Sequence, residues 1–238
     1  MRIKRYILIF IVVFTVLSYV AFRTNTITSK NTVPAYWVWG GIGIDDIPDK
    51  HAELYLQQGY FKITKTNQAY YRHRGLYAYP AFFNNIHLVY RLDNLVTITS
   101  VTSIIKHDIA RWRRHNVKVI GVQLDFDAAT RKLADYVEYL GKIKHNIDSN
   151  LIFSTTGLGT WLLEADSNTL ARFENTVDYI VYQLYVGRRP IKNITSYERK
   201  LRQLKAPFKT GLLKGQLLKN NNIKDNSNYK GSIIFYQK

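Results

Sequence analysis

The sequence predicts a single α/β domain with a TIM-barrel-like (β/α)8 fold, preceded by an N-terminal hydrophobic helix. From residue 34 onward, short apolar runs alternate with amphipathic segments. The runs are apolar almost throughout, which is typical of parallel strands that are buried on both faces. About eight such runs occur, and this favours a closed barrel over an open doubly wound sheet. No glycine-rich turn of the dinucleotide-binding kind opens a helix.

The composition is that of a globular chain, with 46% hydrophobic and 21% charged residues among 238. We expect three segments. Residues 1–23 form a signal anchor or signal peptide, residues 24–33 form a polar tether, and residues 34–238 form the barrel domain.

The N-terminal segment places three basic residues before an uncharged apolar run at residues 6–22. This length suits either a short membrane span or the core of a signal peptide. Tyr19 would stand third before a cut after Ala21, a position that favours small residues, so we expect an uncleaved anchor. The positive N-terminus then stays in the cytoplasm, and the protein is a single-pass inner-membrane protein with its C-terminal domain in the periplasm. Secretion after signal cleavage is the alternative.

The barrel elements follow from the apolar patterning. Helical stripes recur in four segments, and the strands between them are rich in β-branched and aromatic residues. We expect strands at residues 34–40, 51–63, 86–93, 117–127, 151–158, 178–185, 208–213 and 232–238. We expect helices at residues 101–116, 130–147, 161–176 and 196–205, a hairpin or excursion at 64–84, and a polar loop at 214–231.

Polar side chains are expected to gather at the carboxyl ends of three neighbouring strands. Successive side chains of a strand point to opposite faces, so one alternating set on each strand faces the barrel interior. In TIM barrels, chemistry collects at this end of the strands. The inward polar residues expected there are Arg91 and Asp93 on one strand, Gln123, Asp125 and Asp127 on the next, and Gln183 and Tyr185 on a third.

The two aspartates of "QLDFD" are the candidate catalytic residues. Arg91 can offset the cost of burying one carboxylate and keep it ionised. Two neighbouring carboxylates also raise one pKa, which is what a general acid requires. The alternative is a structural network that closes the top of the barrel with satisfied hydrogen bonds.

The segment "GVQLDFDAATRKLADYVEYLGKIK", followed by "FSTTGL", "VYQLYVGRRPI" and "APFKTGLL" and preceded by "HLVYRLD", resembles a bacterial family known as domain of unknown function 3142. The resemblance covers nearly all of residues 34–238. It implies a TIM-barrel-like fold and brings no established activity.

"GVQLDFD" is also distantly similar to the DGxDxDxE motif of chitinase-like glycoside hydrolases. That similarity implies that Asp127 is the proton donor and that Asp125 orients the substrate. "QLYV" is similar to their Met-x-Tyr-Asp piece through Gln183 and Tyr185. Two departures matter, because the donor is the shorter Asp and the acid after the tyrosine is replaced by Val186.

Three functions are consistent with these features. The first is a glycoside hydrolase-like envelope protein that acts on a polysaccharide or oligosaccharide. The second is a non-catalytic carbohydrate-binding or envelope assembly protein with a degenerate active site. The third is a basic surface module for anionic lipid or polymer, since the net charge is +17.

The sugar-binding residues expected for the first two functions are Gln123, Arg91, Gln183, Tyr185, Trp37 and Trp39. Asp45, Asp46, Asp93 and Glu164 are all possible as a second carboxylate, and a substrate-assisted route needs none. We expect no cofactor and no metal, because the chain lacks cysteine and its six histidines show no paired ligand spacing. No nucleic-acid-binding motif accompanies the basic residues, so nucleic acid is not an expected partner.

Overall fold

The computed structural model describes residues 35–39, 49, 51–66, 68–75, 85–219 and 221–236. All of them belong to one compact unit, Val33–Lys238. The expected anchor at residues 1–23 and the tether at 24–33 lie outside the described residues, as do Asp45 and Asp46. Within the described ranges, no helix has the length and apolar character that a bilayer span requires.

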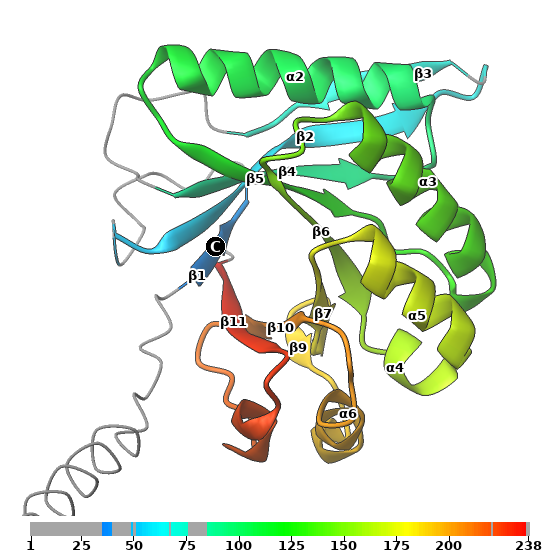
Figure 1. The fold of residues 1–238 in the computed structure, drawn as a ribbon, viewed down its shortest axis with the longest axis vertical. Coiled ribbons are helices and arrows are strands. Elements are labelled where there is room, and N and C mark those ends of the chain that lie inside the picture. Colours follow the sequence, from blue (N-terminus) through cyan, green and yellow to red (C-terminus); the bar gives the residue numbers. More distant parts are fainter. Residues whose placement is uncertain are drawn as a thin grey trace, which may run out of the picture. The chain divides into compact units, whose positions relative to one another are not determined.

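Eight parallel strands close into a barrel, which confirms the predicted TIM-barrel-like architecture. Around the barrel, each strand pairs with the next and β1 pairs with both β11 and β2, so the sheet closes on itself (Figure 1). In this order the strands are β1 (Ala35–Val38), β2 (Glu53–Ile63), β4 (Ile86–Leu92), β5 (Val119–Asp125), β6 (Ile152–Leu158), β7 (Tyr179–Gln183), β10 (Phe208–Leu213) and β11 (Tyr229–Tyr236).

Two antiparallel hairpins are added to the barrel. β3 (Ala69–His73) folds back on the end of β2, so a hairpin forms in the first part of the segment expected to be an excursion or hairpin, residues 64–84, and residues 76–84 lie outside the described residues. β8 (Tyr185–Val186) and β9 (Arg189–Pro190) form a second, short hairpin after β7. Both therefore lie at the carboxyl ends of the barrel strands, which we call the C-terminal mouth.

Helices cover the outside of the barrel between β4 and β10 (Figure 1). The two longest helices each bury one apolar stripe against the strands, as the periodic patterning predicts. The helices are α2 (Ile98–Arg114), α3 (Leu133–Asn146), α4 (Trp161–Glu164), α5 (Ser167–Thr176) and α6 (Ile194–Leu201), with 3₁₀ turns η2 (Thr130–Lys132) and η3 (Asn221–Asp225).

The structure departs from a regular (β/α)8 pattern in two respects. The single helix expected at residues 161–176 is divided into α4 and α5, because Asp166 accepts a hydrogen bond from the Thr169 amide and starts a new helix. The described residues of the β1–β2, β2–β4 and β10–β11 connections contain no α-helix. Strand and helix thus alternate regularly only from β4 to β10.

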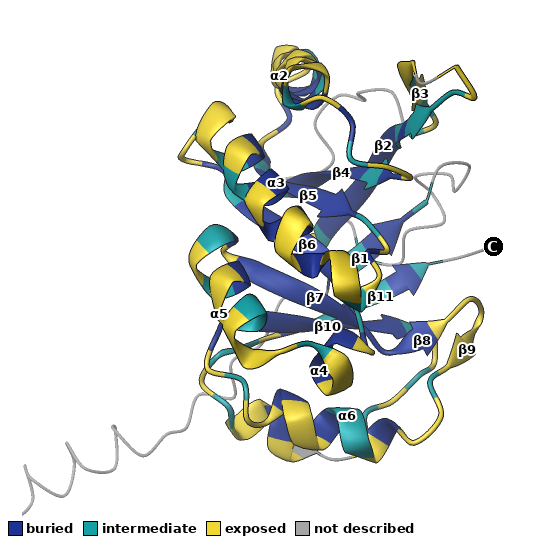
Figure 2. Cartoon of the chain, turned by 90° about the vertical axis from the view of Figure 1, so that its right-hand side faces the viewer, coloured by how far each residue is buried: buried dark blue, intermediate teal, exposed yellow. Residues whose placement is uncertain are grey.

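The core has two layers. The outer layer lies between the strands and the helices, where the strands are buried (Figure 2). It includes Val122 and Leu124 of β5. The inner layer lies inside the barrel, and its members come from β1, β2, β4, β7, β8 and β11. This inner cluster consists of Ala35, Trp37, Tyr55, Val89, Tyr179, Val181, Tyr185, Ile233 and Phe235.

A charged network lies near the amino ends of the strands, at the opposite end of the interior from the mouth. Glu53 accepts a hydrogen bond from Lys209 (Nζ–Oε2, 2.7 Å), and its other oxygen lies 2.7 Å from the His87 Nε2. Lys209 also donates to the hydroxyl of Tyr55, which lies 2.5 Å from that of Tyr179. The charges at this end are thus paired within the barrel.

Candidate functional site

Arg91 joins the two candidate aspartates at the C-terminal mouth. It stands directly opposite Asp125 in the register of β4 and β5. Its Nη1 lies 3.0 Å from Asp125 Oδ2, and its Nη2 lies 2.6 Å from Asp127 Oδ2. One guanidinium therefore binds a carboxylate from each of two inward positions, so the expectation that these side chains converge is met.

Asp125 is the buried member of the pair, with a side chain only 1% exposed. Besides the Arg91 contact, its Oδ1 accepts a hydrogen bond of 2.5 Å from the Thr156 hydroxyl on β6. Burial raises the pKa of Asp125, and the charge of Asp127 adds to this, although Arg91 and Thr156 act in the opposite direction. Asp125 thus holds Arg91 in place from below.

Asp127 is the accessible member, with a side chain 43% exposed. Its Oδ1 makes no hydrogen bond within the described part of the chain. The backbone beside it is held in place, because the Ala128 carbonyl accepts a hydrogen bond from Trp161 Nε1 (2.9 Å). Asp127 therefore presents a fixed carboxylate at the rim, with one oxygen directed by Arg91 and the other available.

Two buried polar atoms near this rim have no partner within the described ranges: the Tyr185 hydroxyl and the Trp39 indole nitrogen. Burial raises the pKa of Tyr185, and the charges of Asp125 and Asp127 raise it further against the effect of Arg91. This places the hydroxyl within electrostatic reach of both aspartates. Buried donors and acceptors nearly always find a partner, so these two atoms can take one from a ligand or from water once the side chains that cover them move.

Hydrogen-bonded side chains fill the barrel interior below the mouth. Trp37 donates from Nε1 to Gln123 Oε1 (2.8 Å), and Gln123 donates from Nε2 to the Ser154 hydroxyl (3.2 Å). Both Trp37 and Gln123 are fully buried, and Gln183 is nearly so. Of the two tryptophans expected to bind sugar, Trp39 is therefore the one that a ligand at the rim would reach.

The other two candidate carboxylates in the described residues, Asp93 and Glu164, already have partners. Asp93 pairs with Lys62 (2.9 Å) and lies 3.8 Å from the Arg91 Nε. Glu164 accepts a hydrogen bond from Thr130 (3.0 Å) on the outer side of the mouth. Over the described ranges, no group of three His, Cys, Asp or Glu side chains is placed to hold a metal ion.

A cavity of about 370 Å³ opens beside this site. It lies between the β2–β3 hairpin and the ends of β1 and β4, and it adjoins Arg91. Its volume is at the small end of the range of about 300–1,000 Å³ that is usual for ligand pockets. Its walls are formed by Trp39, Gln57, Tyr60, Lys62, Arg74, Arg91 and Asp93.

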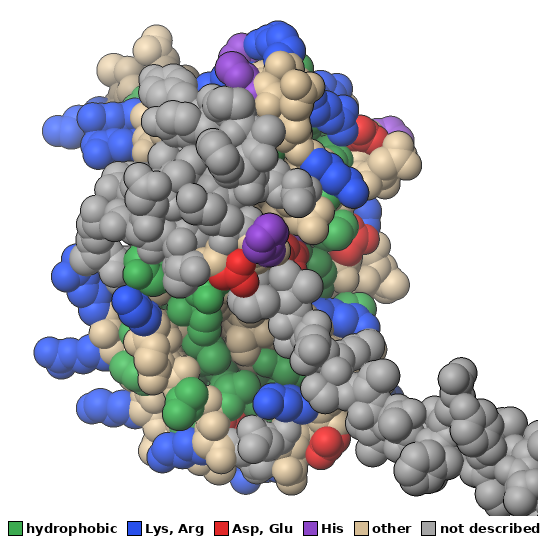
Figure 3. Space-filling model, turned by 90° about the vertical axis from the view of Figure 1, so that its left-hand side faces the viewer, with side chains coloured by type: hydrophobic (Ala, Val, Ile, Leu, Met, Phe, Trp, Pro, Cys, Tyr) green, Lys and Arg blue, Asp and Glu red, His purple; other side chains and the backbone are tan. Residues whose placement is uncertain are grey.

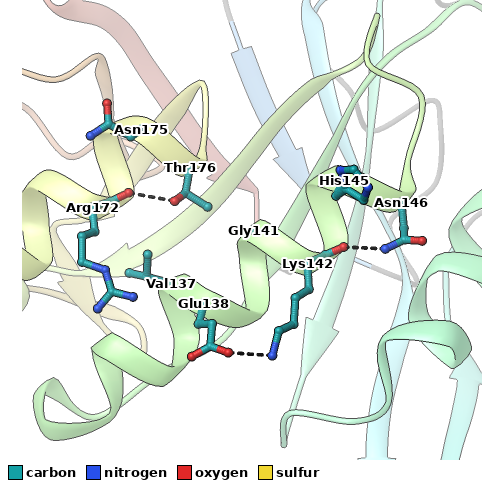
Figure 4. A pocket seen from close by; sticks show the side chains of 9 residues that line it. All are labelled: Val137, Glu138, Gly141, Lys142, His145, Asn146, Arg172, Asn175 and Thr176. Atoms are coloured by element: carbon teal, nitrogen blue, oxygen red, sulfur yellow. Dashed lines mark hydrogen bonds and ion pairs between the residues drawn. The ribbon is translucent and has the colours of Figure 1, made fainter.

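A groove of about 530 Å³ between α3 and α5 is a less suitable site (Figure 4). It lies on the outer surface of the helices, where Gly141 leaves space between them. Glu138 and Lys142 on its edge form an exposed ion pair of 2.6 Å with each other. No buried charged side chain lines it, whereas the mouth contains the buried Asp125 and its ion pair with Arg91. The mouth is therefore the better candidate for a functional site.

The family comparison covers the elements that build this mouth. The model of the family described as "Domain of unknown function (DUF3142)" matches residues 85–207, slightly more than half of the chain. The chain belongs to this family. The matched part of the DUF3142 chain contains Arg91, Asp125, Asp127, Thr156 and Tyr185. No curated protein matches the sequence.

Sequence reasoning missed some residues of the DUF3142 mouth. Thr156 and Ser154 bind Asp125 and Gln123, respectively. Ser154 and Thr156 are two residues apart in "FSTTGL", so both point to the same face of the strand. The alternation that predicts the inward residues of the other strands therefore predicts these two as well. Arg74 and Tyr60 carry no comparable signal, because their place beside the mouth depends on the antiparallel pairing of β2 with β3.

Proposed function

We propose that the DUF3142 barrel binds a polysaccharide or oligosaccharide segment across its C-terminal mouth. The observation that carries this proposal is the Arg91 bridge, which holds the exposed Asp127 carboxylate at the same mouth as two buried polar atoms, Trp39 Nε1 and the Tyr185 hydroxyl, that have no partner in the described residues. Sugar hydroxyls both donate and accept hydrogen bonds, so they suit a carboxylate and an indole N–H together. Tyrosine and tryptophan also supply rings on which a pyranose can pack.

Binding without turnover is the form of this function that the geometry favours. A carboxylate held 2.6 Å from a guanidinium is arranged to accept hydrogen bonds rather than to give up a proton. Asp125 is too buried to reach a glycosidic oxygen. The DUF3142 chain is then a carbohydrate-binding or envelope assembly protein that keeps a glycoside hydrolase-like barrel.

Hydrolysis is the second candidate, and one observation favours it. Asp127 is 43% exposed and has an oxygen without a partner in the described residues, so it can approach a bound sugar. In this reading Asp127 leaves Arg91 when substrate enters and protonates the leaving oxygen. No second carboxylate is then needed, because the acetamido oxygen of the substrate attacks the anomeric carbon as the glycosidic C–O bond breaks, and water hydrolyses the resulting cyclic intermediate.

The test is a screen of the full-length chain in detergent against peptidoglycan and exopolysaccharide fragments. Equilibrium binding and release of reducing ends are measured for the wild type, Asp127→Asn and the control Asp135→Asn on the outer helix α3. We expect binding without release, and weaker binding for Asp127→Asn only. Release that Asp127→Asn abolishes would establish the hydrolase reading, and a complete absence of binding would contradict the proposal.

We propose further that the protein is held in the inner membrane by residues 6–22, with the barrel in the periplasm. The basic residues before this run and its uncharged composition support this orientation. Protease treatment of spheroplasts should remove the barrel, and mass spectrometry of the intact protein should find the N-terminus uncut. A barrel protected from protease would contradict this placement.

A further inference from the structure

The cavity beside the mouth is built by the β2–β3 hairpin. Tyr60 and Lys62 lie on β2, and Arg74 directly follows β3. The opposite wall is formed by Trp39 and Arg91, so the cavity adjoins the Arg91–Asp127 pair. An oligosaccharide that contacts Asp127 can thus place its next sugar unit in this cavity.

Positive charge is in excess on the hairpin wall. The Arg74 guanidinium lies 5.8 Å from the centre of the Tyr60 ring and pairs with no carboxylate in the described part of the chain. Desolvation is the largest single effect on Tyr60 and raises its pKa, but the hydrogen bonds and charges of Arg74 and Arg72 together outweigh it and lower the pKa. Both observations indicate a positive potential that this wall does not itself neutralise.

Lys62 is a second cation that a ligand can recruit at low cost. Its Nζ lies 2.9 Å from Asp93 and 4.7 Å from the centre of the Tyr60 ring. The Lys62 and Asp93 side chains are 39% and 31% exposed, and ion pairs this exposed contribute little. An anionic group in the cavity can therefore share Lys62 with Asp93.

We propose that this cavity is a subsite for an acidic sugar unit, so that the polymer bound at the mouth is an anionic polysaccharide. The inference rests on the proposed function and names its substrate class. Arg74 and Lys62 bind the negative group, a carboxylate or a phosphate. The ring of the unit packs on Tyr60 and Trp39, and the indole N–H of Trp39 donates to one of its oxygens.

A general attraction of polyanions to a basic protein is the competing explanation. The net charge is +17, and Lys and Arg side chains are spread around the face that Figure 3 shows rather than gathered in one patch. Such dispersed charge would attract any polyanion and would respond equally to removal of any one cation. The subsite differs because it combines cations with two aromatic side chains and an unpartnered donor.

The experiment is isothermal titration calorimetry of the full-length chain in detergent. Three oligomers of equal length are compared: a hexuronic acid oligomer, a phosphorylated glucose oligomer and a neutral glucose oligomer. Arg74→Gln is the test variant. Arg172→Gln on α5 is the matched control, because it removes an exposed arginine far from the mouth.

We expect one of the acidic oligomers to bind the wild type about tenfold more tightly than the neutral oligomer, in keeping with one charge-assisted hydrogen bond. Arg74→Gln should remove this preference and Arg172→Gln should keep it. The acidic oligomer with the larger preference identifies the group as carboxylate or phosphate. If the neutral oligomer binds as tightly, or if both variants lose the preference equally, the subsite is refuted while sugar binding stands. If no oligomer binds, the proposed function fails as well.

Discussion

Arg91 and Asp125 stand opposite each other in the register of β4 and β5, and their side chains meet at 3.0 Å. The ion pair that organises the mouth is therefore built by the pairing of two barrel strands and not by loops. Sites on rigid elements hold their geometry well. Asp127, two residues beyond the end of β5, takes its position from this pair through the second nitrogen of the same guanidinium.

Replacing Arg91 with Gln should destabilise the barrel. Asp125 would remain buried without its cation, and breaking such a pair costs about 3–5 kcal/mol when both groups are buried. Because Arg91 is 31% exposed, we expect a smaller loss of about 2–3 kcal/mol. Urea denaturation measures it. The double variant Arg91→Gln with Asp125→Asn should recover part of the loss, and strictly additive effects would show that the pair is not coupled.

A methyl group at Gly121 should be poorly tolerated. A Cβ there would lie 2.2 Å from His87 Nδ1 and 2.8 Å from the Ile152 carbonyl oxygen, inside the barrel. Gly121→Ala should therefore cost about 1–3 kcal/mol, as overpacking does. Gly141→Ala in α3 is the control. Its Cβ would meet nothing closer than 3.9 Å, so a gain of up to about 1 kcal/mol is expected from helix propensity. Equal thermal midpoints for the two variants would contradict this account.

Alternation along strands was sufficient to predict the Arg91–Asp125–Asp127 group, because β4 and β5 are neighbours both in sequence and in space. It could not predict the network of Glu53 and Lys209, which lie 156 positions apart and meet only when the barrel closes. The same limit applies to Arg74, whose position requires the fold-back of β3. The break between α4 and α5 was open to prediction, since Asp166 is a good N-cap residue.

The Glu53 network should make the protein sensitive to acid. Burial raises the pKa of Glu53, but the interactions with His87 and Lys209 together outweigh this and lower the pKa from the ordinary 4.5 to about 2. Because the folded pKa is depressed, this stability is present above pH 4.5 and is lost as the pH falls from about 4.5 towards 2. The loss should amount to at most about 3 kcal/mol.

His87 contacts Glu53 and has a pH dependence of its own, which must be separated from that of Glu53. Burial lowers the pKa of His87, so acid also destabilises the fold through His87 below its ordinary value of 6.5. Glu53→Gln should remove the part of the loss between pH 4.5 and 2 that Glu53 causes. The loss that begins near pH 6.5 should remain or grow, because Glu53 itself raises the pKa of His87. The exposed Glu138→Gln should leave the profile of the wild type. Parallel profiles for wild type and Glu53→Gln would contradict the assignment.

Sugar binding at the mouth is the central claim, and a fluorescence titration with oligosaccharides tests it most directly. Trp39 lines the cavity, whereas Trp37, Trp112 and Trp161 are fully buried. The wild type should show a saturable change in tryptophan emission, and Trp39→Phe should lose it while Trp112→Phe keeps it. A saturable change that survives in Trp39→Phe, or no saturable change with any neutral or acidic oligosaccharide, would contradict the account.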